Sequence, residues 1–130
     1  MIDSILIVED DTDLRLLFAF AFEDAFKEAE VTACYTKDQA VKLARQRKSH
    51  FSLYVLDGNF PENEGEPEAY GACFIFYDKL VAMYESRPNV IIYTGTDEIK
   101  EEAERRGIPA FIKGNGIEPI EELARRYVSN

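Results

Sequence analysis

The stretch ILIVEDD at residues 5–11 indicates both the fold and the position of a site. Its four apolar residues, three of them β-branched, form a run too short for a buried helix and typical of a strand covered on both faces. Three acidic residues follow where the strand would end. In open α/β sheets, ligands bind beyond the carboxyl ends of parallel strands. The stretch therefore predicts a central strand that delivers carboxylates to a binding edge.

Four further short apolar runs occur at residues 31–35, 53–56, 90–93 and 110–112. Segments of helical period separate them, as expected for alternating strands and helices. The runs at 53–56 and 90–93 are almost purely apolar, whereas those at 31–35 and 110–112 are more mixed, which suits edge strands. The pattern predicts an α/β fold in which a doubly wound, five-stranded parallel sheet forms the middle of a three-layer α/β/α sandwich.

Five helices are predicted between and after the strands. In the first, one face carries Leu14, Leu17, Phe18, Ala21 and Ala25, and in the second one face carries Ala40, Val41 and Ala44. Residues 36–39 read TKDQ, a capping box for the second helix. The remaining helices are expected at 74–84, at 97–106 with Thr96 as cap and Gly107 as stop, and at 119–128 with Pro119 in the first turn.

Length and composition predict a single domain over residues 1–130, without an output domain. No apolar run approaches the roughly 18 residues of a membrane span, and the first four residues do not resemble a signal peptide, so we expect a cytoplasmic protein. A net charge of -10 argues against direct binding to nucleic acid or to anionic membranes. Cys34 and Cys73 are interpreted as buried thiols because their spacing fits no metal site.

Polar residues follow the predicted strands at one edge of the sheet. Glu9 and Asp10 follow the first strand, Asp57 the third and Thr94 the fourth, and Lys113 ends the fifth. Carboxylates that converge on one crevice repel one another unless a cation neutralises them. Oxygen ligands without a nearby His or Cys indicate a hard ion, and Mg²⁺ suits two or three carboxylates with waters.

This arrangement is equipped to receive a phosphoryl group. Asp57 would attack in line, while the metal and Lys113 stabilise charge on the phosphoryl oxygens and Thr94 donates its hydroxyl to one of them. Asp11 and Asp13 are better explained as acidic residues that favour the start of the first helix.

Together these residues resemble the receiver domains of two-component response regulators, over essentially the whole chain. The acidic pair after the first strand, the DGNFP loop at residues 57–61, Thr94-Gly95 and Lys113 carry the resemblance. It implies a flavodoxin-like sheet of order 2-1-3-4-5, with Mg²⁺ held by Glu9, Asp10, Asp57 and the backbone carbonyl of Asn59.

The resemblance also implies a function and partners. A sensor histidine kinase or a histidine phosphotransfer protein would donate the phosphoryl group to Asp57, and an unknown downstream protein would read the result. Such a domain is not an enzyme beyond its own phosphorylation and dephosphorylation. His50 precedes the third strand, away from the acidic edge, and is expected at the surface.

Three features depart from the family pattern. Gly114 stands where Pro usually follows the lysine, and Ala110 replaces the usual aromatic switch residue, with Phe111 one place late and expected on the opposite face. The interval 61–71 is longer than usual and carries Glu62, Glu64, Glu66 and Glu68. It is either a solvated loop insertion or an acidic contact for a partner.

Two alternatives remain open. A pseudo-receiver would keep the fold as an interaction module without phosphorylation. A phosphatase of the haloacid-dehalogenase type would need a second Asp two residues after the nucleophile, where this chain has Asn59. Nuclease or topoisomerase-like acidic folds fail at the same residue and on net charge.

Overall fold

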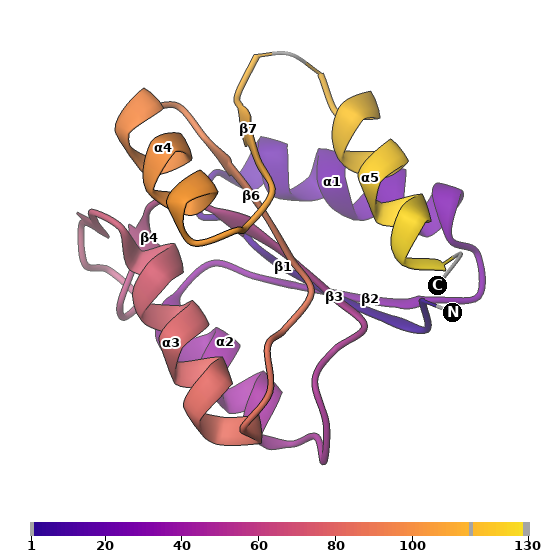
Figure 1. Ribbon diagram of the computed structural model, residues 1–130, viewed down its shortest axis with the longest axis horizontal. Helices are drawn as coiled ribbons and strands as arrows, with labels where there is room; N and C mark the ends of the chain where they lie inside the picture. The colour runs from indigo at the N-terminus through magenta and orange to yellow at the C-terminus, as the bar shows by residue number, and fades with distance from the viewer. Residues whose placement is uncertain (1, 115, 129–130) are drawn as a thin grey trace.

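Parallel strands and helices alternate along the chain in the computed structural model, which describes residues 2–114 and 116–128 (Figure 1). The elements are β1 Ser4–Val8, α1 Thr12–Ala25, β2 Glu30–Cys34, α2 Lys37–Arg45, β3 Leu53–Asp57, β4 Phe60–Pro61, β5 Glu68–Ala69, α3 Ala72–Tyr84, β6 Val90–Thr94, α4 Asp97–Arg105, β7 Ala110–Ile112 and α5 Glu118–Val128. The five predicted strands and five predicted helices are all present, and the bounds that were predicted differ from these by at most two residues.

The main sheet has the order β2-β1-β3-β6-β7, and each neighbouring pair is parallel. Because β6 and β7 are its fourth and fifth strands along the chain, this is the predicted order 2-1-3-4-5. The chain starts in the middle of the sheet, extends to the β2 edge, and then returns across β1 to build the other half. The order therefore reverses between β1 and β3, and a crevice is expected at their carboxyl ends.

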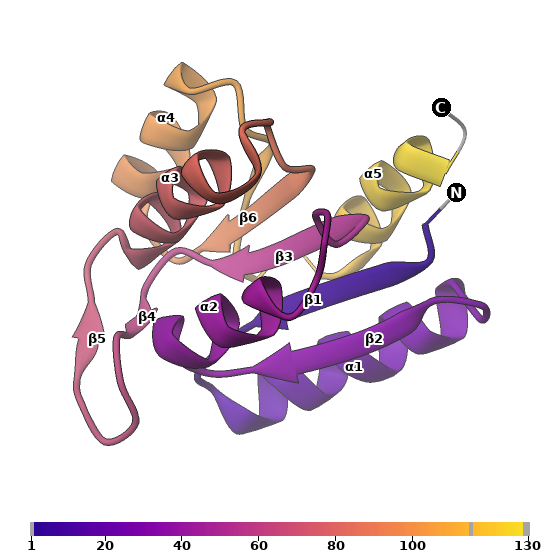
Figure 2. The same cartoon turned by 90° about the horizontal axis from the view of Figure 1, so that it is seen from below.

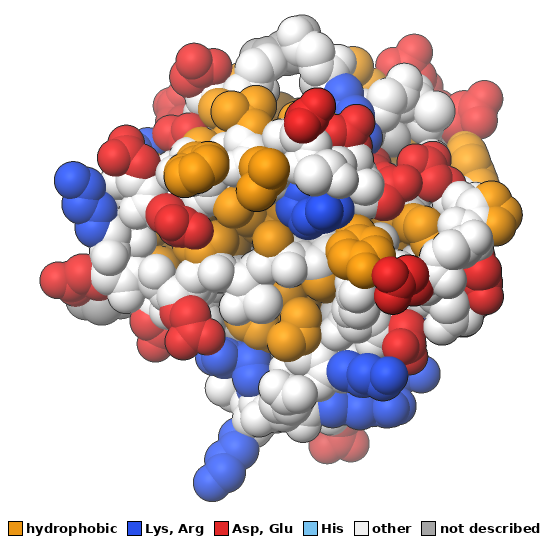
Figure 3. Space-filling model, turned by 180° about the vertical axis from the view of Figure 1, so that it is seen from behind, with side chains coloured by type: hydrophobic (Ala, Val, Ile, Leu, Met, Phe, Trp, Pro, Cys, Tyr) orange, Lys and Arg blue, Asp and Glu red, His pale blue; other side chains and the backbone are white. Residues whose placement is uncertain are grey.

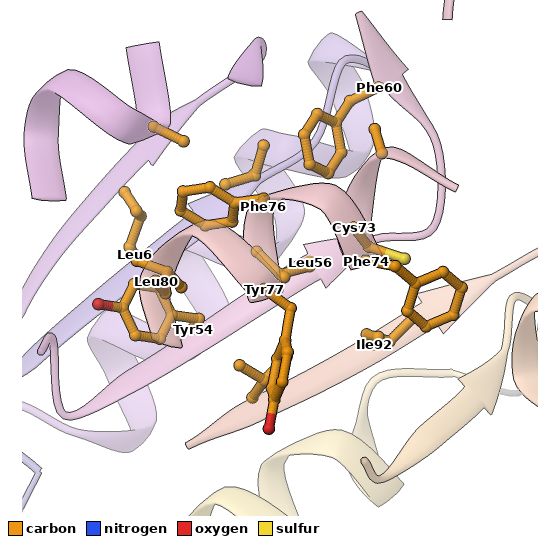
Figure 4. Close-up of a cluster of buried hydrophobic side chains, with 14 of the residues drawn as sticks. Leu6, Tyr54, Leu56, Phe60, Cys73, Phe74, Phe76, Tyr77, Leu80 and Ile92 are labelled. Atoms are coloured by element: carbon orange, nitrogen blue, oxygen red, sulfur yellow. The ribbon is translucent and has the colours of Figure 1, made fainter. Parts of the chain in front are cut away.

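Helices cover both faces of the sheet, so the central strands alternate between two buried layers (Figures 1 and 2). One layer faces α2, α3 and α4 and contains the side chains of Leu6, Val8, Tyr54, Leu56 and Ile92. Figure 4 shows part of this layer, in which the α3 rings of Phe74, Phe76 and Tyr77 lie over the sheet. Toward α1 and α5 point Ile5, Ile7, Leu53, Val55, Ile91 and Tyr93. The near-continuous apolar runs of β1, β3 and β6 follow from this two-sided burial.

The first helix is turned relative to its predicted face. Leu17 was expected in the core but is 53% exposed, and the helix instead buries Phe18 and Phe22 against the sheet. The two large rings take the contact because they bury more apolar area than the leucine would. Leu16, Leu17 and Phe20 are left exposed, and Figure 3 shows hydrophobic side chains among acidic ones on the side of the molecule where α1 lies.

Two predicted caps have different outcomes. The Thr36 hydroxyl accepts a hydrogen bond from the Gln39 amide (3.1 Å), and the Gln39 side chain accepts one from the Tyr35 amide (3.0 Å), which confirms the capping box of α2. Thr96 is the N-cap residue of α4, but its side chain makes no capping hydrogen bond. Its hydroxyl lies 3.4 Å from that of Thr94 instead.

The interval 61–71 contains a short antiparallel hairpin, β4–β5, that was not predicted, because two-residue strands show no periodicity. In Figure 2 the hairpin lies on the side toward which the arrows of the main sheet point. Its base is anchored to α2: the Lys37 ammonium lies 2.8 Å from Glu62, whose carbonyl accepts a hydrogen bond from the Asp38 amide. The base of the insertion is therefore held at the start of α2, beyond the carboxyl edge of the sheet.

His50 lies away from the acidic edge, as expected, but it is only partly exposed. Its ring is half-buried between Tyr54 and Tyr84, and its two nitrogens lie 3.1 Å from the Tyr54 hydroxyl and 3.0 Å from the Ser86 carbonyl. The residue therefore connects the start of β3 to the segment after α3, because each ring nitrogen has a polar partner there.

No described helix is long and apolar enough to cross a membrane.

Candidate functional site

The strand register brings the predicted acidic residues into one row. Asp57 pairs with Tyr93, and Val8, which precedes Glu9, pairs with Leu56, which precedes Asp57. Because side chains alternate along a strand, Glu9, Asp57 and Tyr93 continue the layer that faces α1 and α5. The acidic crevice thus lies at the end of this layer, over the point where the strand order reverses.

Three predicted metal ligands lie together. Glu9, Asp10 and Asp57 each offer a carboxylate oxygen, and these oxygens all lie within 4.8 Å of one another. Glu9 is 0% and Asp57 4% exposed. The Lys113 ammonium lies 3.0 Å from Asp57 Oδ1 and 3.4 Å from Glu9 Oε1. The ends of β1, β3 and β7 thereby meet around two buried carboxylates, those of Glu9 and Asp57.

The β1–α1 loop is held by a residue that the sequence analysis did not identify. The Arg15 guanidinium donates to the carbonyl of Glu9 (2.8 Å) and lies 3.4 Å from that of Asp10. The Asp11 amide donates to Glu9 Oε2 (3.2 Å), while the Asp11 carboxylate caps α1 through the Leu14 amide (2.9 Å). The interpretation of Asp11 as a helix cap is confirmed. An arginine one turn into an acidic helix start was the available signal for the loop contact.

Asn59 uses its side chain to close the β3–α3 loop. Its Oδ1 accepts a hydrogen bond from the Gly71 amide (2.7 Å), at the start of α3, and its own amide lies 3.4 Å from Asp57 Oδ1. Gly71 has a φ of 71°, a left-handed conformation that favours glycine. Since the side chain is occupied, a metal contact from Asn59 would come from its backbone carbonyl, as the resemblance implied.

Thr94 lies at the same edge but on the other face of the sheet. It is buried, and its hydroxyl accepts a hydrogen bond from the Thr96 amide (3.3 Å). A Cβ atom on Gly58 would lie only 2.7 Å from this hydroxyl oxygen, so the glycine directly after Asp57 lets the two strands' ends approach. Lys113 is tied to the same place, because its amide donates to the Thr94 carbonyl (2.8 Å).

The electrostatics of the crevice favour a bound cation. Burial raises the pKa of Glu9 to about 8, and the neighbouring Asp57 carboxylate adds to the shift. Burial also raises the pKa of Asp57, opposed by its contacts with Glu9 and Lys113. Burial acts to lower the pKa of Lys113, but the charges of Asp57 and Glu9 outweigh it and the ammonium stays charged. One ammonium faces three carboxyl groups, and the raised pKa of Glu9 reflects this deficit of positive charge.

The donor set fits a hard divalent ion. All three side chains offer oxygen, which suits Mg²⁺. Glu9 Oε1 is buried and has no hydrogen bond from any described residue, although it is ion-paired with Lys113. A buried carboxylate oxygen without a hydrogen bond is costly, and a cation would supply the missing partner.

The insertion contributes a fourth carboxylate that the sequence analysis did not place. Glu68, in β5, lies near Asp10: interaction with the Asp10 carboxylate raises its pKa, and partial burial and repulsion raise it further. The alternating glutamates at 62, 64, 66 and 68 gave no means to distinguish Glu68 from the others. Only the formation of the hairpin, which puts Glu68 in β5 near Asp10, does so.

The sheet order, the helices on both faces and the position of the acidic edge define a flavodoxin-like α/β fold of the receiver type. Comparison of the sequence with family profiles gave no match, and comparison with curated proteins gave no relative.

Solved structures identify the fold as that of response-regulator receiver domains. The chain is similar to the signal receiver domain of a DNA-binding response regulator from Colwellia psychrerythraea 34H, with a TM-score of 0.76 and 23% identity over 98% of this chain and 99% of the other. It is also similar to the receiver domain of HemR from Leptospira biflexa (TM-score 0.74, 23% identity, 98% and 95% covered). A response regulator from Thermotoga maritima, TrrA, solved with Mg²⁺ and beryllofluoride, has a TM-score of 0.74 at 13% identity, with 96% and 98% covered.

Proposed function

We propose that residues 1–130 form a single receiver domain that accepts a phosphoryl group on Asp57 in a Mg²⁺-dependent reaction. The observation that carries the proposal is the surrounding of Asp57: a buried carboxylate, 3.0 Å from the Lys113 ammonium and clustered with Glu9 and Asp10, at the edge where the strand order reverses. The likeness to receiver structures over nearly the whole chain supports it.

Each residue has a role in this proposal. Glu9, Asp10, Asp57 and the backbone carbonyl of Asn59 would hold Mg²⁺, which would offset charge on the phosphoryl oxygens. An oxygen of Asp57 attacks phosphorus while the bond from phosphorus to the donor nitrogen breaks. Lys113 stabilises the negative charge of the transferred group, and the Thr94 hydroxyl is the donor that approaches it once the aspartyl phosphate has formed.

The donor and the reader of this signal are proposed from the fold class. A sensor histidine kinase or a histidine phosphotransfer protein supplies the phosphoryl group, and an unidentified downstream protein binds the product through surface contact. The chain acts as a cytoplasmic signalling domain rather than an enzyme on other substrates. The net charge of -10 makes nucleic acid or an anionic membrane an unfavourable direct partner.

Incubation with acetyl phosphate and Mg²⁺, followed by intact mass measurement, tests the proposal. The wild type is expected to gain the mass of one phosphoryl group, and Asp57→Asn is expected to gain none because the attacking oxygen is lost. Asp13→Asn, a change at an exposed acidic residue in the first turn of α1, serves as a control and is expected to behave like the wild type. A mass gain that persists in Asp57→Asn would show that another residue accepts the group.

The pseudo-receiver is the alternative that one observation favours. Ala110 packs on the α4 side and Phe111 on the α1/α5 side, so no aromatic ring on β7 stands next to Thr94 on its own face. A wild type that gains no phosphoryl group and does not respond to Mg²⁺ would establish this alternative. Release of phosphate from a phosphomonoester would instead indicate the haloacid-dehalogenase type of reaction.

A further inference from the structure

Tyr93 carries a buried polar atom that the proposed reaction does not use. The residue is 1% exposed, and its hydroxyl has no hydrogen-bond partner among the described residues. A buried hydroxyl without a partner costs stability, so its position calls for an explanation. A phenylalanine would fill the same space without that cost.

The tyrosine ring is clamped beside the acidic crevice. Tyr93 pairs with Asp57 across β6 and β3, and the alternation of side chains puts both on the α1/α5 face. The Phe18 ring, from α1, packs on it with a centroid distance of 4.4 Å. The Lys113 ammonium, which is ion-paired with Asp57 and Glu9, lies 5.5 Å from the centroid of the Tyr93 ring. These contacts leave the ring little freedom to turn its hydroxyl elsewhere.

Within the described part of the chain, Glu9 lacks a hydrogen-bond donor for one of its carboxylate oxygens. Its Oε1 is fully buried, and this oxygen, like the Tyr93 hydroxyl, has no hydrogen bond from any described residue. Burial, and then the charges of Glu9 and Asp57, raise the pKa of the Tyr93 phenol, which shows that the hydroxyl interacts with both carboxylates. An ordinary phenol already keeps its proton at neutral pH, since its pKa is about 10. A protonated phenol next to a carboxylate is a hydrogen-bond donor.

We propose that Tyr93 is a positioning residue of the metal site, whose hydroxyl donates a hydrogen bond to the Glu9 carboxylate and holds it toward Asp10 and Asp57. The inference rests on the proposed Mg²⁺ site and adds a residue to it. Glu9 needs such support because a glutamate has one more rotatable bond than an aspartate and loses more freedom when it binds a metal. Residues that orient ligands through hydrogen bonds contribute strongly to metal affinity.

The test is calorimetric titration of the whole chain with MgCl₂. Tyr93→Phe removes only the hydroxyl and is expected to weaken Mg²⁺ binding by about tenfold, the lower end of what the loss of such an orienting group costs. Tyr54→Phe is the matched control: this tyrosine is equally buried in the adjacent strand, but it faces the other layer and its hydroxyl bonds the Phe51 amide and His50. Its Mg²⁺ affinity is expected to equal that of the wild type.

A double-mutant comparison separates positioning through Glu9 from a general loss of structure. In a Glu9→Gln background, Tyr93→Phe is expected to change the Mg²⁺ affinity by less than about twofold, because residues that act through one contact are not additive. Saturation with Mg²⁺ should also perturb the ultraviolet absorption of a buried tyrosine in the wild type and in Tyr54→Phe, and this perturbation should be lost in Tyr93→Phe and in Glu9→Gln.

The outcomes that overturn the inference are distinct from those that overturn the proposed function. Equal Mg²⁺ affinity of Tyr93→Phe and wild type contradicts it, as does an equal loss in the Glu9→Gln background. A wild type that binds Mg²⁺ without perturbing a tyrosine contradicts it even if Tyr93→Phe fails to fold. A wild type that binds no Mg²⁺ overturns the proposed metal site itself, and this inference with it.

Discussion

Gly58 is the residue at which the acceptor loop and the end of β6 come closest. An added Cβ would lie 2.7 Å from the Thr94 hydroxyl oxygen and 3.1 Å from Ile99 Cγ2, on α4. Because both neighbours are buried, the contact would be relieved by moving Thr94 and the start of α4. The glycine after Asp57 is thus explained by close approach rather than by backbone conformation.

Gly58→Ala is accordingly expected to destabilise the protein by about 1–3 kcal/mol, the usual cost of overpacking a tight contact. Urea unfolding checks this. Gly95→Ala is the control, because an added Cβ there has no heavy atom within 4 Å. An unchanged unfolding free energy for Gly58→Ala would show that Thr94 and α4 move freely.

Glu9 predicts how stability depends on pH in the absence of metal. Its pKa is raised from 4.5 to about 8, so between these values the folded chain holds a proton that the unfolded chain has released. Stability therefore falls as pH rises through this window. Lys113 does not contribute to the change, because its raised pKa keeps it charged in both states there.

Chemical denaturation in a chelating buffer is expected to give a lower unfolding free energy at pH 8 than at pH 5. Glu9→Gln should flatten the difference, since it removes the titrating group but keeps the shape. An exposed change such as Glu101→Gln should leave the slope as it is in the wild type. If Glu9→Gln does not change how the unfolding free energy depends on pH, groups other than Glu9 cause the dependence.

At the scale of the element, α3 ends on an unfavourable residue. Glu85, at its C-cap, has φ 52° and ψ 34° and is the only described non-glycine residue with positive φ. A side chain in this left-handed region costs roughly 1–2 kcal/mol, whereas glycine adopts it freely. Replacing Glu85 by glycine would remove this cost, but part of the stabilisation would be lost because glycine also makes the unfolded chain more flexible.

Glu85→Gly is therefore expected to stabilise the fold by about 0.5–1 kcal/mol. The matched control is Ala82→Gly, at an exposed position inside the same helix, which should destabilise by about 1 kcal/mol. Thermal and urea unfolding distinguish the two variants by sign. Destabilisation by Glu85→Gly would indicate that its side chain matters more than its backbone.

At the scale of the molecule, the acidic edge links three strands and the inserted hairpin in one electrostatic unit. Glu9 and Asp10 come from the loop after β1, Asp57 comes from β3 and Glu68 from β5. One ammonium, that of Lys113, lies between the two buried carboxylates of Glu9 and Asp57. A ligand that binds only the folded state raises its stability by mass action. Neutralising this edge should therefore stabilise the whole domain.

Millimolar Mg²⁺ is expected to raise the melting temperature of the wild type by a few degrees, as binding worth about 1–2 kcal/mol would do in a domain of this size. The double variant Asp10→Asn, Asp57→Asn should lose most of the response. Asp38→Asn, an acidic change at the start of α2, is the control. An equal response in the double variant would locate the ion elsewhere.

The sequence by itself determined which segments form strands, which of these strands are buried in the middle of the sheet, and which residues lie at its carboxyl edge. Apolar runs such as 53–56 are local patterns that predict strands. The acidic or polar residue that follows each run must then lie at the carboxyl edge of the sheet. The parallel α/β class then brings Glu9, Asp57 and Lys113 together without further information. The capping box of α2 and the cap at Asp11 were equally local, because their hydrogen bonds span three or four residues.

Only the tertiary structure decided which residues from outside these patterns reach the site. The hairpin turns one of four similar glutamates, Glu68, toward Asp10, and the rotation of α1 buries Phe18 against Tyr93 while Leu17 stays exposed. The position of Tyr93 beside Asp57 depends on the pairing of β3 with β6 and on a ring from another element. Such placements arise from packing between segments distant in the chain, where several residues of the same type compete for one position and local periodicity does not distinguish them.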